Sequence, residues 1–130
     1  MVQSAPSSTL QLSWKKRDGG GWYKFLRVRL TKRSLGKGGA YVIWAEDATG
    51  ANKKTVYVGQ GKPIADCLER HRGEKAITKH QTDGRVLRVT WAKVAKNQRG
   101  GVEHYLADTL KPVEGDRWSD DDPLHVNLPW

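Results

Sequence analysis

The stretch Gly39–Gly61, GAYVIWAEDATGANKKTVYVGQG, decides the fold of this chain. It contains two short runs, Tyr41–Trp44 and Thr55–Val58, whose β-branched and aromatic content is typical of strands. The segment between them, Asp47–Lys54, consists largely of residues that favour turns. The stretch therefore predicts a β-hairpin, and each of its strands carries one tyrosine close to a glycine.

Hydrophobic spacing predicts the remaining elements of the main domain. A helix is expected from Pro63 to Gly73, a strand over Val86–Val94, and a second helix between Gly101 and Pro112. The predicted fold class is α+β, with a central antiparallel sheet of about three strands flanked by helices. The domain is expected to cover residues 39–130.

Residues 1–38 are predicted to form a basic extension, a strand pair packed on this domain. Apolar residues alternate over Leu10–Trp14, and Trp22–Leu30 alternates so that Tyr23 and Phe25 share a strand face with two arginines. Nine Lys and Arg residues but one Asp fall between positions 15 and 37. The basic residues predicted to contact nucleic acid are Arg27, Arg29, Lys32, Arg33 and, near the groove, Arg72.

The composition of the chain indicates what kind of partner it binds and in which cellular compartment it works. The chain has 130 residues, enough for one domain with its own core, and a net charge of +9 that favours a polyanion such as nucleic acid. The alternative is a basic protein without such a partner. The single cysteine allows no intrachain disulfide and fits the reducing cytoplasm, and no apolar run is long enough to span a membrane.

Several side chains have the chemistry that phosphodiester hydrolysis needs. A tyrosine can act as general base if a nearby cation lowers its pKa, as is possible for Tyr41 or Tyr57. His71 can relay a proton, and Glu103 can bind Mg²⁺ when waters and phosphate oxygens complete the octahedron. The alternatives are ordinary core tyrosines, a packing histidine and a solvated glutamate. No spacing of cysteine and histidine supports a zinc site.

These residues, in this order, resemble the motifs of the GIY-YIG nuclease family. Gly39-Ala40-Tyr41 stands at the GIY motif, Tyr57-Val58-Gly59 at the YIG motif, His71 at the basic or histidine position, Glu103 at the metal-binding glutamate, and Asn127 at the C-terminal asparagine. The resemblance implies a small antiparallel sheet flanked by helices, one divalent metal (Mg²⁺ or Mn²⁺) held by Glu103, and hydrolysis of DNA. It also implies that one of the two tyrosines activates water and that Asn127 organises the groove.

One residue departs from the family pattern. Cys67 stands where the family usually has an arginine that binds the scissile phosphate. Cysteine cannot make the charged, forked hydrogen bond that arginine makes to phosphate. Losing this contact in the transition state lowers the cleavage rate by roughly two to three decades. Three explanations are open: a substitution made to inactivate the enzyme, a naturally weakened relative, or replacement by Arg70, about one helical turn further on.

The sequence thus predicts a divalent-metal-dependent DNA endonuclease, impaired to some degree at Cys67, in the cytoplasm. The alternative is a non-catalytic nucleic-acid-binding module on the same fold. A structural or protein-binding domain is a third class, in which the charge serves solubility alone. The DNA site, the biological role and the oligomeric state do not follow from the sequence.

Overall fold

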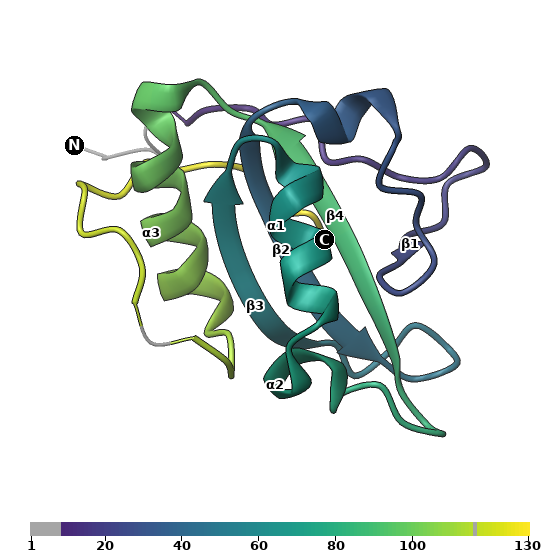
Figure 1. Ribbon diagram of the computed structural model, residues 1–130. Coiled ribbons are helices and arrows are strands. Elements are labelled where there is room, and N and C mark those ends of the chain that lie inside the picture. Colours follow the sequence, from purple (N-terminus) through teal and green to yellow (C-terminus); the bar gives the residue numbers. More distant parts are fainter. Residues whose placement is uncertain (1–8, 116) are drawn as a thin grey trace.

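The computed structural model describes residues 9–115 and 117–130 (Figure 1). Residues 1–8, part of the predicted extension, and residue 116 lie outside the described residues. In the described part of the chain, no helix is both long enough and apolar enough to cross a membrane.

The predicted hairpin is confirmed. Strand β2 (Gly39–Glu46) pairs antiparallel with β3 (Lys54–Gly61). The side chain of Asp47 fixes the turn, because its Oδ1 accepts the backbone N–H groups of Thr49 at 2.9 Å and Ala51 at 3.0 Å. The two strands that carry the motif tyrosines are therefore locked together by local turn chemistry.

The sheet has four strands instead of about three. Its order is β1-β4-β2-β3, and every neighbouring pair is antiparallel. β4 (Val86–Lys93) forms as predicted beside β2, and β1 (Tyr23–Lys24) adds a short outer strand from the N-terminal segment. The α+β class is confirmed, and β2 lies in the interior of the sheet.

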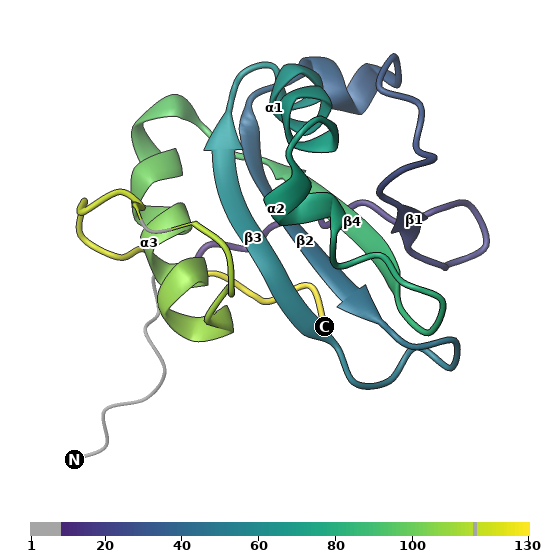
Figure 2. The same cartoon turned by 60° about the horizontal axis from the view of Figure 1, so that its bottom comes forward.

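Both faces of β2 are covered, so all eight of its residues are buried. On one face, Ile43 belongs to a hydrophobic cluster that includes residues of helix α1 (Ile64–Arg72). On the other, Val42 packs with residues of helix α3 (Arg99–Leu110) and of the C-terminal tail. Figures 1 and 2 show α1 between β1 and α3, with the tail passing on the other side of the sheet.

The helices follow the predicted pattern. α1 ends at Arg72, and the next residue, Gly73, caps it by donating its N–H to the carbonyl of Arg70 at 3.0 Å. A short helix, α2 (Lys75–Thr78), follows directly. The described residues also form two short 3-10 turns, η1 (Arg33–Gly36) and η2 (Lys96–Gln98).

The N-terminal segment adds to the sheet through one short strand, where the sequence predicted a pair. Within residues 9–38, the only strand is β1, and Leu10 forms a single bridge with Val126. The chain turns after β1, since the N–H of Val28 donates to the carbonyl of Lys24 at 2.9 Å. Phe25 and Val28, three residues apart, are both buried, so the spacing suits a turn better than an alternating strand.

Candidate active site

Tyr41 and Tyr57 lie on the same face of the hairpin. Tyr41 is paired with Gly59 and Ile43 with Tyr57, so the two tyrosines are diagonal neighbours. Their rings are stacked, with centroids 6.3 Å apart and planes at 17°. A Cβ atom at Gly59 would overlap the Tyr41 hydroxyl, which explains why a glycine faces this tyrosine.

We expect Gly59→Ala to lower the free energy of unfolding by about 1–3 kcal/mol, because the buried Tyr41 ring has to move away from its hydrogen-bond partner. Urea unfolding measures this effect. Gly84→Ala is the matched control, since a Cβ there meets nothing within 4 Å, and it should change stability by less than about 0.5 kcal/mol. Equal stability of the two variants would show that the close approach at Gly59 is unimportant.

His71 joins Tyr41 to an acidic residue of the segment that follows α1. The Tyr41 Oη lies 2.7 Å from His71 Nε2, and His71 Nδ1 lies 2.6 Å from Oε1 of Glu74. An ionised carboxylate only accepts hydrogen bonds, so Nδ1 carries the proton and Nε2 accepts from the Tyr41 hydroxyl. The three side chains form a hydrogen-bonded chain, and the His71 ring also lies 4.4 Å from the Tyr57 ring.

Burial governs the protonation of this chain. It raises the pKa of Tyr41 far above the ordinary value, and the neighbouring Cys67 and Tyr57 raise that pKa further. It lowers the pKa of His71 below 6.5, although the hydrogen bond to Glu74 opposes this shift. At neutral pH, Tyr41 is therefore protonated and His71 is neutral, ready to accept a proton.

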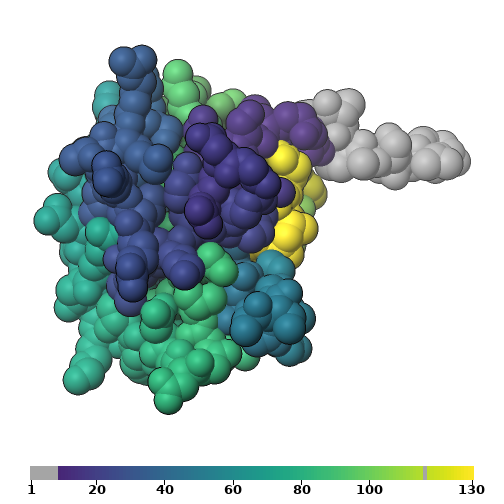
Figure 3. All heavy atoms as spheres, turned by 90° about the vertical axis from the view of Figure 1, so that its right-hand side faces the viewer, coloured from purple at the N-terminus to yellow at the C-terminus, as the bar shows by residue number. Residues whose placement is uncertain are grey.

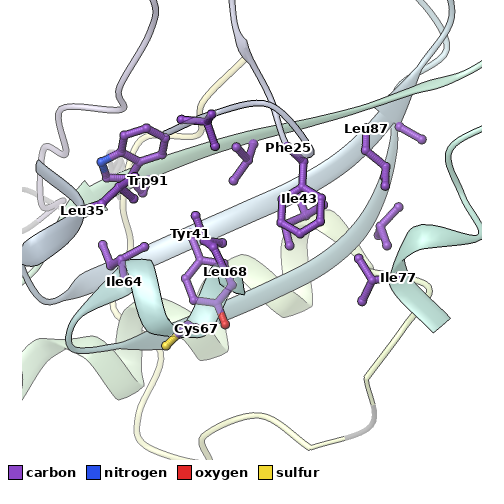
Figure 4. Packing of buried hydrophobic residues seen from close by; sticks show 14 residues of the cluster. Phe25, Leu35, Tyr41, Ile43, Ile64, Cys67, Leu68, Ile77, Leu87 and Trp91 are labelled. Atoms are coloured by element: carbon purple, nitrogen blue, oxygen red, sulfur yellow. The ribbon is translucent and has the colours of Figure 1, made fainter. Parts of the chain in front are cut away.

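Cys67 and Arg70 lie near the tyrosines and have opposite effects on the pKa of Tyr41. Cys67 is buried, with its sulfur against Gly61, and lies with the Tyr41 hydroxyl at one end of the cluster (Figure 4). Arg70 lowers the pKa of both tyrosines, opposing the larger effect of burial. It also lines an open hollow of about 500 Å³. The other residues lining that hollow include Tyr57, His71, Glu74, Lys75 and Glu114.

Glu103 approaches the same tyrosines from α3. Its carboxylate raises the pKa of Tyr57, second only to burial in its effect, and that of Tyr41 more weakly. Oε1 of Glu103 accepts the N–H of Ser119 at 2.9 Å. The structure thus brings together Tyr41, Tyr57, Cys67, Arg70, His71 and Glu103, six of the seven residues expected at the site.

Glu103 has no basic partner in the described residues. It is buried, burial raises its pKa, and no Lys, Arg or His forms an ion pair with it within residues 9–115 and 117–130. The same part of the chain contains no group of three or more His, Cys, Asp or Glu residues that could hold a metal. A divalent ion here would be held by one carboxylate, with water and phosphate oxygens completing its coordination, as Mg²⁺ accepts.

The loop after α3 fixes Glu103 relative to β3. The N–H groups of Val113 and Glu114 donate to the carbonyls of Thr55 and Val56, at 3.1 and 2.9 Å. The indole Nε1 of Trp118 donates to the Val58 carbonyl at 3.1 Å. This segment therefore binds the edge strand on both sides of Tyr57 and places Ser119 against Glu103.

The expected role of Asn127 in the groove is not supported by its contacts. Its Oδ1 accepts the N–H of Leu12 at 2.6 Å, and its Nδ2 donates to the Leu12 carbonyl at 3.0 Å. Leu12 belongs to the hydrophobic cluster on the α3 face of the sheet, whereas Tyr41 belongs to the cluster that includes α1. Asn127 joins the C-terminal tail to the N-terminal segment.

Arg72 also has a different role from the predicted phosphate contact. Its guanidinium donates to the carbonyls of Phe25, at 3.0 and 2.8 Å, and Val28, at 2.5 Å. Burial lowers its pKa, as expected for a guanidinium turned into the protein. The exposed Arg27, Arg29 and Lys32 line a separate hollow, and Arg33 lines a neighbouring one.

Two residues at the site were not predicted from the sequence. Glu74 lies three positions after His71, which brings side chains together on a helix, and this spacing was the available signal. Ser119 acts through its backbone N–H, so no side-chain pattern could have revealed it.

Comparison of the chain with protein-family models, with curated proteins and with solved structures gives no match. The resemblance to GIY-YIG nucleases therefore rests on the order of the motif residues, and function has to be inferred from the chemistry of the site.

Proposed function

We propose that the protein is a divalent-metal-dependent DNA endonuclease of the GIY-YIG type that works in the cytoplasm. The observation that carries this proposal is the hydrogen-bonded chain of Tyr41, His71 and Glu74 beside Tyr57, together with Glu103, which forms no ion pair in the described part of the chain. It combines a proton acceptor with a carboxylate suited to bind Mg²⁺ or Mn²⁺, and these elements serve phosphodiester hydrolysis.

In the proposed reaction, the oxygen of a water molecule forms a bond to phosphorus while the bond from phosphorus to one ester oxygen breaks. The Tyr41 oxygen accepts a proton from the water as its own proton passes to His71 Nε2. Glu74 stabilises the imidazolium through Nδ1, and the departing oxygen takes a proton from solvent. Tyr57 lines the hollow and orients the attacking water.

A metal at Glu103 would stabilise negative charge on the phosphate oxygens. Glu103 would hold it through one carboxylate, and Ser119 would keep that carboxylate oriented through its hydrogen bond.

Among the three explanations for Cys67, the position of Arg70 favours replacement. Arg70 lines the hollow beside Tyr57 and His71, and its charge acts on both tyrosines. We infer that Arg70 binds the scissile phosphate, with less favourable geometry than a residue at position 67 would have.

We expect the protein to cleave at least one member of a DNA panel in Mg²⁺ or Mn²⁺: supercoiled plasmid, linear duplex, flap or branched junction. Arg70→Ala should reduce the cleavage rate about 10- to 100-fold, because a charged contact with the phosphate is lost. Cys67→Arg should raise the rate above that of the parent. Lys54→Ala, an exposed charge outside the hollow, is the control. Arg70→Ala with the parent's rate would exclude the phosphate contact.

The alternative is a nucleic-acid-binding module without cleavage. The buried Cys67 favours it, because cysteine cannot supply the positive charge of the arginine that the family usually has at this position. Titration with Mn²⁺ discriminates the two: the nuclease binds Mn²⁺ through Glu103, whereas the module has no need to do so.

A further inference from the structure

A second hollow, of about 390 Å³, opens on the N-terminal segment. Its charged lining residues are Arg17, Lys24, Arg27, Arg29 and Lys32, and no acidic residue lines it. None of these five cations forms an ion pair in the described part of the chain. In Figure 3, the N-terminal segment covers much of the face on which they lie.

The backbone beneath these cations is held from the interior of the protein. Phe25 and Val28 are buried, and the guanidinium of Arg72 binds both of their carbonyl groups. Because Val28 lies between them in sequence, Arg27 and Arg29 project from an anchored turn. The cations are thus presented by a fixed backbone, which lowers the entropic cost of binding an anion.

A contact between two aromatic rings joins this hollow to a second basic one. Tyr23 lines the first, with Lys32 Nζ 5.3 Å from its ring centroid. The Tyr23 ring lies 5.1 Å from the ring of Trp91, which lines the neighbouring hollow. The cations of that neighbour are Lys15, Arg33, Lys37 and Lys93. The positive charge therefore extends over two adjoining hollows, further than a single small anion can span.

We infer that these two hollows, here called the basic track, bind the sugar-phosphate backbone of duplex DNA outside the site of cleavage. A regularly charged polymer can neutralise successive unpaired cations, and each contact releases counterions. The track and the catalytic hollow have no lining residue in common. Tyr23 and Lys24 of β1 line the track, whereas Arg70 and His71 of α1 line the catalytic hollow.

The inference deepens the proposed function, on which it rests for the choice of DNA as ligand, but it is tested without cleavage. We would measure binding of a fluorescent 20-base-pair duplex by anisotropy, without divalent metal, over a series of salt concentrations. The test variant is Arg27→Ala/Arg29→Ala. The control is Lys54→Ala/Lys96→Ala, which removes the same charge from exposed positions outside both hollows.

The test variant should bind at least about tenfold more weakly than the parent, and the control less than about threefold. The slope of log K against log salt concentration should fall by about 2 for the test variant, close to 0.9 for each lost phosphate contact. Equal losses of affinity for the two double variants would overturn the inference, as would a parent that binds heparin but not duplex DNA. Circular dichroism and thermal melting check that both variants fold.

Cleavage assays separate this inference from the proposed function. If the parent cleaves DNA and the test variant binds DNA like the control, the proposed nuclease function is supported and DNA binding by the basic track is rejected. If the parent does not cleave DNA and only the test variant loses binding, DNA binding by the basic track is supported and the proposed nuclease function is rejected.

Discussion

Glu103→Gln should cleave DNA at least about a hundredfold more slowly than the parent, in Mg²⁺ and in Mn²⁺, while binding DNA with unchanged affinity. Glutamine keeps a side-chain oxygen able to accept the Ser119 N–H but lacks the negative charge that attracts a divalent ion. The loss corresponds to transition-state stabilisation of about 3 kcal/mol or more. Initial cleavage rates test the expected loss of activity, and DNA binding measured without metal tests the expected unchanged affinity.

Thermal unfolding distinguishes a lost ligand from a lost fold in this variant. Because burial raises the pKa of Glu103, the folded state disfavours its ionised form, and stability falls as pH rises from the ordinary glutamate pKa of 4.5 through the raised pKa of the folded state. At neutral pH the uncharged glutamine should unfold at the same temperature as the parent or higher. A variant that is equally stable and equally active would show that Glu103 holds no catalytic metal.

Tyr41→Phe should reduce the cleavage rate about 10²- to 10³-fold, because it removes the hydroxyl that passes a proton to His71. Tyr57→Phe should have a smaller effect, since Tyr57 orients water in this mechanism. His71 acts in its neutral form and burial lowers its pKa, so the parent's rate should fall with acidification only below pH 6.5. Single-turnover cleavage rates measured over a range of pH test this fall in rate at low pH, the acid limb of the pH profile.

Glu74→Gln tests the hydrogen-bonded chain of Tyr41, His71 and Glu74 through a change in the pH dependence of the cleavage rate. The Glu74 carboxylate raises the pKa of His71 against the larger effect of burial, so its removal lowers that pKa further. The acid limb should then move to lower pH, while the rate on the plateau falls because the imidazolium loses its partner. A lower rate with an unmoved acid limb would mean that Glu74 acts only on folding.

The hairpin, α1, α3 and β4 could be predicted because their signals are local. Turn residues separate β2 from β3, and Gly73 ends α1 next to a run of helical periodicity. The N-terminal segment could not be predicted in this way. Its alternating pattern favours a strand, but the turn is held by Arg72, which is 47 positions away from Phe25.

The same distinction between local signals and long-range contacts applies to the site. Tyr41, Tyr57, His71 and Glu103 could be found from motif order, and the structure brings them together. Asn127 has the expected residue type near the C-terminus, but its partner is the backbone of Leu12, 115 positions away. Such long-range backbone contacts depend on the packing of the whole sheet, which motif spacing does not contain.

The segment that binds the edge of β3 has a consequence for the handling of this protein. An unpaired edge strand is a template on which other molecules add strands and aggregate. Here the backbone of residues 113–114 and the indole of Trp118 engage that edge, and the adjoining Ser119 holds Glu103. One loosening event would both uncover the edge and misplace the carboxylate, so heat inactivation and precipitation should share a single onset temperature.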